Sequence, residues 1–138
     1  FVADVNVSLK IDHEWVGDLA ARLVAPDGTT ALLFEHPGFP ALSSGCNGEN
    51  LDLGLDDEAV LTATDLENTC NNMPAISGVF QPVESLDRFD NSNVNGIWKL
   101  EVADIFPEDG GALVEWGLSF CFYQEVPPAE ILVNNPLT

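Results

Sequence analysis

The sequence predicts an all-β domain, and three observations lead to this fold class. Apolar and polar residues alternate with a period of two in several segments, which is typical of strands with one buried and one solvated face. Turn-forming residues such as Pro, Asp, Asn and Gly separate these segments. No window that is long enough for a helix shows helical spacing of its apolar residues. The simplest architecture is a β-sandwich or jelly-roll.

The first strands follow from alternation and turn chemistry. Apolar residues alternate with polar ones through VNVSLKID (residues 5–12), which predicts a strand. Residues 18–34 are predicted to form a hairpin, because LAARLVA alternates, TTALLF follows, and Pro26-Asp27-Gly28 lies between them. Proline presets one backbone dihedral in such a turn, and glycine accepts a positive φ.

The middle of the chain is expected to be a long, loop-rich excursion. From residue 35 to about residue 90, short apolar pieces stand between stretches rich in Gly, Pro, Asn and Ser. Loops of this length are usually functional or held in place by a disulfide or a bound ion.

Regular structure is expected to return in the last third of the chain. IWKLEVAD and LVEWGLSFCFY alternate around the turn EDGGA, and predict a closing hairpin. The three tryptophans, at positions 15, 98 and 116, fall at alternating strand positions or strand ends and are assigned to the core. Residues 1–125 are expected to form one domain, and residues 126–138, which include a Pro-Pro pair, a linker or the start of a following domain.

The charge balance excludes several function classes. The chain of 138 residues carries 23 Asp and Glu against four Lys and Arg, for a net charge of −19. Such a surface repels phosphate backbones and anionic lipids, so binding of nucleic acid or of membranes is not expected. No apolar run is long enough for a transmembrane helix. The chain opens directly on a strand pattern, and we expect a leader and any upstream domain to precede it.

The three cysteines allow one intramolecular disulfide at most. Cys46 and Cys70 lie in polar, turn-rich segments, whereas Cys121 lies in the apolar run WGLSFCFY. We therefore expect a Cys46–Cys70 disulfide, which would close a loop of about 25 residues and contribute about 3 kcal/mol. A disulfide implies an oxidising compartment, so the protein is expected to be secreted or at the cell surface. Cys121 is expected to be a small buried hydrophobic residue.

Two segments together resemble a known family. HEWVGDLAARLVAPDGTTALLF (residues 13–34) resembles the opening hairpin of the P domain, or Homo B domain, that follows the subtilisin-like catalytic domain of kexin, furin and other proprotein convertases. NGIWKLEVADIFPEDGGALVEWGLSF (residues 95–120) resembles its closing hairpin. The middle, with two cysteines around Asp-Asp-Glu-Ala, is similar to the bacterial, secreted branch of the family.

The resemblance implies a β-sandwich of jelly-roll type with no active site of its own. It implies a partner, an adjacent catalytic domain in the same chain, which would be a subtilisin-like serine endopeptidase. The expected role is to stabilise or position that neighbour. The alternative is a stand-alone module that binds carbohydrate or another cell-surface polymer through exposed aromatics such as Trp15, Phe39 or Phe106.

Catalysis within these residues is not expected. A nucleophile triad needs a Ser or Cys beside a His that an acid orients, and no nucleophile turn such as Gly-x-Ser-x-Gly is present. Of the two histidines, His13 is interpreted as a structural residue next to the first strand, and His36 as an exposed loop residue.

A calcium site is the better-motivated prediction. Asp56, Asp57 and Glu58 are adjacent, and hard oxygen ligands without a His or Cys cluster favour calcium over zinc. A regular strand would point Asp57 away from its two neighbours, so a loop or another segment is required. Asp18 and Asp104, at strand ends, are the candidates to complete the site. The competing interpretation is that Asp56 and Asp57 hydrogen-bond backbone amides in a turn.

Overall fold

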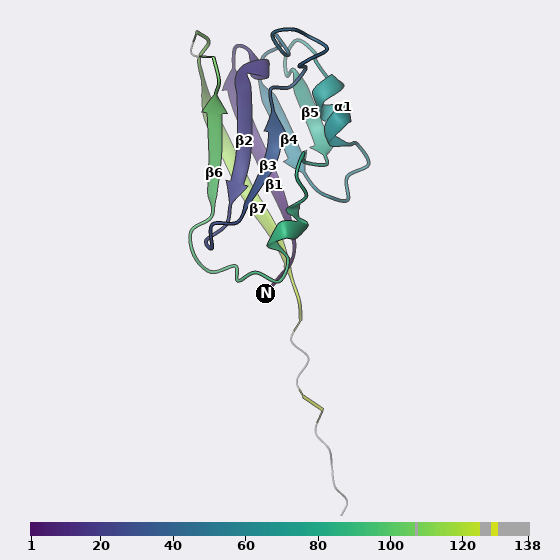
Figure 1. The fold of residues 1–138 in the computed structure, drawn as a ribbon, viewed down its shortest axis with the longest axis vertical. Coiled ribbons are helices and arrows are strands. Elements are labelled where there is room, and N and C mark those ends of the chain that lie inside the picture. Colours follow the sequence, from purple (N-terminus) through teal and green to yellow (C-terminus); the bar gives the residue numbers. More distant parts are fainter. Residues whose placement is uncertain (107, 125–127, 130–138) are drawn as a thin grey trace, which may run out of the picture.

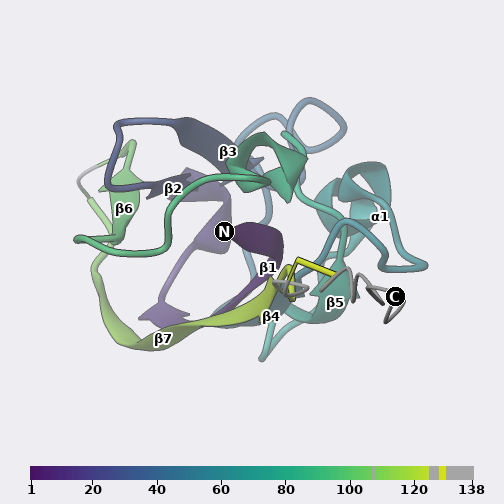
Figure 2. The same ribbon diagram turned by 90° about the horizontal axis from the view of Figure 1, so that it is seen from below.

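The computed structural model describes residues 1–106, 108–124 and 128–129, and it consists of two β-sheets in two layers (Figures 1 and 2). The four-stranded sheet has the order β5-β4-β1-β7 and the three-stranded sheet the order β3-β2-β6. The strands are β1 (Val2–His13), β2 (Leu19–Val24), β3 (Thr30–Glu35), β4 (Leu51–Leu55), β5 (Ile76–Phe80), β6 (Lys99–Asp104) and β7 (Gly111–Phe122). The predicted all-β class is confirmed, and the jelly-roll subtype stays a prediction.

The first strand and the β2–β3 hairpin form as their patterns indicate. The predicted closing hairpin is wrong, because β6 pairs with β2 in one sheet and β7 pairs with β1 in the other. β1 pairs antiparallel with both β4 and β7. Its inward residues Val5, Val7, Leu9 and Ile11 are at most 2% exposed. β2 pairs antiparallel with β3. In the turn between them the side chain of Asp27 accepts a hydrogen bond from the Thr29 amide at 2.9 Å, and Gly28 has a φ of 89°.

The middle region is loop-rich as predicted, but it also contains short regular elements that the sequence pattern did not predict. It contains β4, β5, the helix α1 (Ala63–Asn68) and the 3₁₀ turn η2 (Leu86–Phe89), and a further 3₁₀ turn, η1 (Val16–Asp18), precedes β2. β5 is paired in parallel with β4, so a partner distant in sequence stabilises it. α1 begins with a capping box between Thr62 and Asp65 and buries only Leu66. Both elements are too short for a periodic pattern to stand out.

The core lies between the sheets and is tightest around β1–β5. Its largest fully buried side chains include Phe34, Phe80 and Phe89. Trp98 and Trp116 are half-buried and pack against this core. Trp98 makes edge-to-face contacts with Phe89 and Phe120, with ring centroids 5.3 and 5.1 Å apart. Trp15 is not part of the core, so its core assignment is wrong.

Two further residues differ from expectation. Cys121 is exposed, because it lies on the same face of β7 as Ser119 and opposite Asp4 of β1, away from the core. The apolar run around Cys121 hides this alternation in the sequence. His36 is half-buried rather than exposed, because its ring stacks on Phe39 with centroids 4.6 Å apart.

Candidate functional site

The five predicted acidic ligands lie in two groups at opposite ends of β1. β4 runs antiparallel to β1 with Leu55 opposite Val7, so Asp56–Glu58 lie toward the N-terminal end of β1. Asp104 pairs with Leu19 and contacts His13, so Asp18 and Asp104 lie at its C-terminal end. At about 3.3 Å per strand residue, the two groups are about 20 Å apart. The structure brings Asp18 and Asp104 together and does not bring them to Asp56–Glu58.

In the first group the acids form turns. The Asp57 carboxylate accepts hydrogen bonds from the hydroxyl of Ser85 at 2.7 Å and from the amides of Leu86 and Asp87, both at 2.9 Å. Asp56 accepts one from the Glu58 amide at 2.8 Å. Both oxygens of Asp57 are therefore used to cap η2, which is the turn interpretation of this motif.

The second group is centred on Asp18, which ends η1 and is only 4% exposed. Its Oδ2 atom is buried and has no hydrogen-bond partner among the residues that the structure describes. The backbone around it is held in place, since the carbonyl of Asp18 accepts a hydrogen bond from the Ile105 amide at 2.7 Å. A buried carboxylate oxygen without a partner is costly unless a cation or a proton satisfies it.

His13 positions Asp104 beside Asp18. The imidazole is 5% exposed, and its Nδ1 accepts a hydrogen bond from the Trp15 amide at 3.1 Å. Nε2 therefore carries the proton and donates it to Oδ2 of Asp104 at 3.0 Å. Asp104 also accepts a hydrogen bond from the Phe106 amide at 3.3 Å. Both ring nitrogens are occupied in structural bonds, which agrees with the structural interpretation of His13.

The surroundings of Asp18 disfavour its charge. Burial raises the pKa of Asp18 above its ordinary value, and the negative charges of Asp109 and Asp104 raise it further, while His13 opposes them. Asp109 lines the same cavity as Asp18. A cation placed among these carboxylates would remove the repulsion.

A pH dependence follows from this shift. Because the pKa of Asp18 is raised in the folded state, its ionisation removes stability as the pH rises from the unfolded pKa through the folded pKa. In the presence of a chelator, we therefore expect Asp18→Asn to stabilise the domain at pH 7. The gain should shrink as the pH falls below the unfolded pKa of about 3.8, where the carboxyl becomes protonated in both states. Urea denaturation across this pH range checks it, and a gain that does not change with pH would contradict the assignment.

A surface cavity of about 560 Å³ opens next to Asp18. Two aromatic rings, two hydroxyls and three carboxylates line it: Trp15, Phe106, Ser43, Ser44, Asp18, Glu108 and Asp109. Within residues 1–106, 108–124 and 128–129, no three His, Cys, Asp or Glu side chains are arranged to hold one metal ion. An ion here would need two or more carboxylates together with backbone carbonyls or water, which calcium accepts.

The sequence prediction missed Asp109 and Glu108 as members of this group. They lie in the turn between β6 and β7, shortly after Asp104 in the sequence, and they line the same cavity as Asp18. The signal was the short connection between the two predicted strands, because a turn that follows β6 so closely stays near the last residue of that strand, Asp104.

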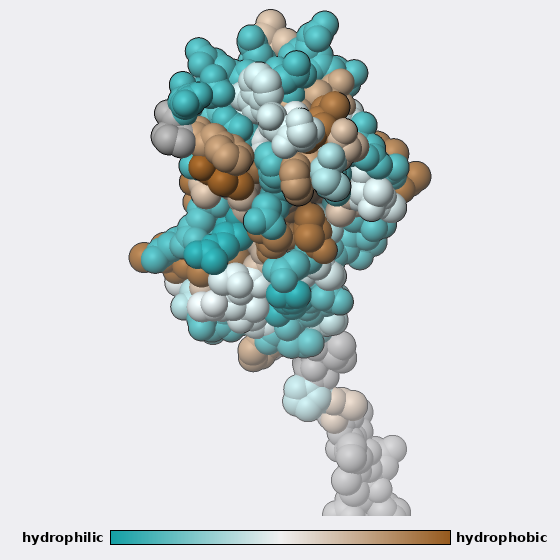
Figure 3. Space-filling view, turned by 45° about the horizontal axis from the view of Figure 1, so that its top comes forward, coloured by the Kyte–Doolittle hydropathy of each residue, from teal (hydrophilic) through white to brown (hydrophobic). Residues whose placement is uncertain are grey.

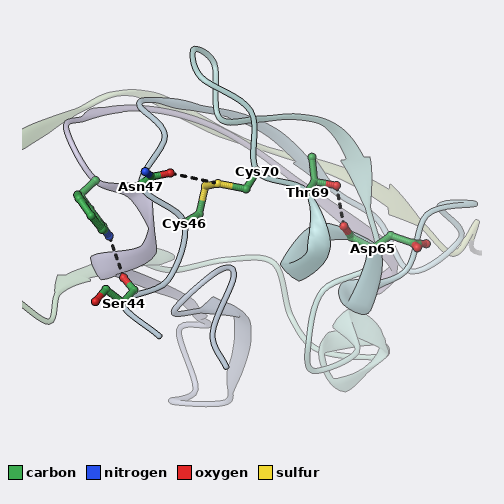
Figure 4. The surroundings of a disulfide bond; sticks show 7 residues. Ser44, Cys46, Asn47, Asp65, Thr69 and Cys70 are labelled. Atoms are coloured by element: carbon green, nitrogen blue, oxygen red, sulfur yellow. Dashed lines mark hydrogen bonds between the residues drawn. A yellow bond between two sulfur atoms is a disulfide. The ribbon is translucent and has the colours of Figure 1, made fainter. Parts of the chain in front are cut away.

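The disulfide holds the loop that borders this cavity (Figure 4). Cys46 and Cys70 are joined, with Cα atoms 5.6 Å apart, and connect the loop before β4 to the end of α1. This is the predicted pairing. Beside it, the indole nitrogen of Trp15 donates a hydrogen bond to the carbonyl of Ser44 at 2.8 Å.

Comparison with known proteins identifies the family. The sequence profile of the proprotein convertase P-domain matches residues 2–53 and 57–120, which is most of the chain. No curated protein and no solved structure matches it significantly. In the part of the chain that the structure describes, no helix is long and apolar enough to span a membrane. The P domain is a non-catalytic accessory domain, typically of secreted proteins, and the chain belongs to the proprotein convertase P-domain family.

Proposed function

We propose that this domain stabilises or positions a neighbouring subtilisin-like serine protease domain in a secreted protein, and that a calcium ion bound at Asp18 holds its loops together. The observation that carries the calcium proposal is the buried Oδ2 atom of Asp18, for which the described part of the chain offers no hydrogen-bond partner. The match to the P-domain family supports the accessory role.

The residues around Asp18 fit a hard cation. Asp18 and Asp109 line the same cavity and can supply carboxylate oxygens, with backbone carbonyls or water completing the coordination, and the net charge of −19 favours divalent cations over anions. These two residues come from η1 and from the turn before β7. An ion held by them would link two segments that are distant in sequence and would balance the repulsion among Asp18, Asp104 and Asp109.

Both histidines have structural hydrogen-bond partners. The ring nitrogens of His13 are bonded to Trp15 and Asp104, and Nδ1 of His36 contacts the carbonyl of Gly17. Neither imidazole has a Ser or Cys side chain among its hydrogen-bond partners. We expect the domain to show no peptidase activity by itself.

The direct test is thermal melting of the domain with calcium and with a chelator. At 100 times the dissociation constant, an ion bound only to the folded state adds about 2.7 kcal/mol. This corresponds to a rise in Tm of about 10 °C for a domain of this size. We expect Asp18→Asn to abolish the calcium-dependent rise, because the amide removes the buried charge.

A matched control is Asp12→Asn, which alters an exposed acid in β1 and should leave the calcium response intact. The calcium proposal fails if wild-type protein melts at the same temperature in calcium and in chelator. It also fails if Asp12→Asn and Asp18→Asn reduce the response equally, since the effect would then reflect net charge alone.

The carbohydrate-binding alternative has less support. All three tryptophans are half-buried, and the indole nitrogens of Trp15 and Trp98 donate to backbone carbonyls at 2.8 and 2.9 Å. Among the aromatics expected for that role, Phe39 and Phe106 are exposed, and their surroundings favour a different ligand.

A further inference from the structure

Exposed apolar side chains gather at the end of the sandwich that carries Asp18. We call this surface the aromatic patch and define it by His36, Phe39, Pro40, Ile105 and Phe106. Phe39 is 45%, Ile105 44% and Phe106 48% exposed. Figure 3, which brings this end of the molecule forward, shows brown apolar areas enclosed by hydrophilic surface. Apolar patches rimmed by polar residues are typical of interaction sites.

A cavity of about 560 Å³ runs along the patch. The ring of His36 lies between the two phenylalanines, with centroids 4.6 Å from Phe39 and 5.8 Å from Phe106. The lining comes from the loop after β3, from α1, from the segment before η2 and from the residues after β6: Glu35, His36, Phe39, Pro40, Glu67, Val83, Ile105 and Phe106. Four segments thus build one concave, largely apolar surface.

The loop that presents Phe39 is fixed rather than free to collapse onto the core. The carbonyl of Pro37 accepts a hydrogen bond from the Cys46 amide at 2.7 Å, and the disulfide holds Cys46 in turn. The backbone is so close here that a Cβ atom added to Gly17 or Gly38 would lie 2.5 or 2.6 Å from the Cys46 nitrogen. A pre-ordered surface loses little conformational entropy when it binds a partner.

The charges around the aromatic patch favour a partner with positive charge. Glu35 and Glu67 line the cavity, and within the described part of the chain no Lys or Arg lines it. Three of the four basic side chains are paired with acids elsewhere, in the pairs Lys10–Glu115, Arg22–Glu101 and Arg88–Glu84. A second copy of the chain also has a net charge of −19, so its approach to the two glutamates at the patch would be repulsive, which disfavours self-association.

The ends of the described domain lie away from the patch. The Tyr123 amide donates to the carbonyl of Phe1 at 3.2 Å, so both residues lie at the opposite end of the sandwich from Asp104 (Figure 1). The twelve residues of β1 separate the two ends, about 40 Å at strand spacing. The patch is therefore open to a segment that is not next to it in the chain.

We propose that the aromatic patch binds a polypeptide segment in which an aromatic or large aliphatic side chain is flanked by Lys or Arg. The apolar side chain packs against Phe39, Ile105 and Phe106, and the basic groups pair with Glu35 and Glu67. Buried aromatic anchors with a charged rim are typical of such contacts. The proposal is independent of calcium and of the accessory role.

Titration of the isotopically labelled domain with the peptide acetyl-GKFRG-amide tests this proposal. The titration is followed by NMR in a buffer with chelator, which removes any contribution from calcium. We expect saturable shifts confined to the patch and its neighbours. Acetyl-GEFEG-amide lacks the basic groups, and acetyl-GKSRG-amide lacks the aromatic ring. Each of these two peptides should bind at least tenfold more weakly.

Variants of the domain separate the apolar contribution to binding from the electrostatic one. Phe106→Ser should raise the Kd at least tenfold, while Val79→Ser, which alters an exposed residue of β5, should not change it. Glu35→Gln with Glu67→Gln changes no packing and should weaken binding about fivefold at low salt, with the difference lost at about 0.5 M salt. Shifts that are absent, spread over the whole acidic surface, or equal for the three peptides would overturn the proposal, as would concentration-dependent self-association through the patch.

Discussion

Replacing both Cys46 and Cys70 with alanine is expected to lower the free energy of unfolding by about 3 kcal/mol. The disulfide joins residues 24 apart in sequence, and the loop it closes contains β4, Asp56–Glu58 and α1. Without it, the unfolded chain gains the conformational freedom of this loop. Alanine is preferred to serine because Cys46 is fully buried and a hydroxyl would lack a partner there. Urea denaturation of the variant and of the oxidised wild type measures the difference.

Cys121→Ala is the matched control for this experiment. Cys121 is exposed and outside the disulfide, so its replacement should change the free energy of unfolding by no more than about 0.5 kcal/mol. A double variant that loses less than about 1 kcal/mol would show that local contacts, not the disulfide, hold this loop. We expect the aromatic patch to loosen together with the disulfide, because Cys46 also anchors Pro37.

Asp57→Ala is expected to cost about 3 kcal/mol, since three hydrogen bonds to a charged group are lost together. These bonds connect the turn after β4 to Ser85, Leu86 and Asp87, which are 28 to 30 residues away in sequence. η2 depends on this cap, and its residues Leu86 and Phe89 are buried in the core. Equilibrium unfolding in urea measures the loss.

The adjacent Asp56→Ala provides the control. Asp56 accepts one hydrogen bond, from the Glu58 amide within the same turn, so we expect a loss of about 1 kcal/mol or less. Equal losses for the two variants would contradict the capping role of Asp57. Because Asp57 has a structural task, these measurements should be unchanged by calcium, whereas those at Asp18 should depend on it.

The two acidic groups of this domain thus have different expected roles. At Asp57, both carboxylate oxygens are hydrogen-bonded, and the bonds of the turn account for Asp56 and Asp57. At Asp18, an oxygen is buried without a partner among the described residues, and the fold leaves a requirement for a cation or a proton. Asp18→Asn is expected to raise the stability in the presence of chelator and to abolish the stabilisation by calcium. The first result reports on protonation of the Asp18 carboxyl and the second on cation binding, so together the two experiments distinguish a proton from a cation at this oxygen.

Much of the fold could be read from local pattern. Alternation in VNVSLKID and the Pro-Asp-Gly turn placed β1 and the β2–β3 hairpin, because side-chain direction along a strand repeats every two residues regardless of its partners. The polar, turn-rich contexts of Cys46 and Cys70 were enough to pair them. β4 and β5 were missed, because each has only five residues and β5 is stabilised by parallel pairing with β4.

The sequence alone was thus sufficient for the all-β class, the first strand, the β2–β3 hairpin, the disulfide and the resemblance to the P-domain family, but not for the placement of β6 and β7 in different sheets. Strand order and direction were needed to show that Asp56–Glu58 and Asp18 lie at opposite ends of β1, and that Asp109 and the aromatic patch lie beside Asp18. The physical reason is that alternation and turn chemistry depend on neighbours in the chain. Whether side chains from β6, η1 and the loop after β3 come into contact depends on how the two sheets pack, and a local sequence pattern does not determine this packing.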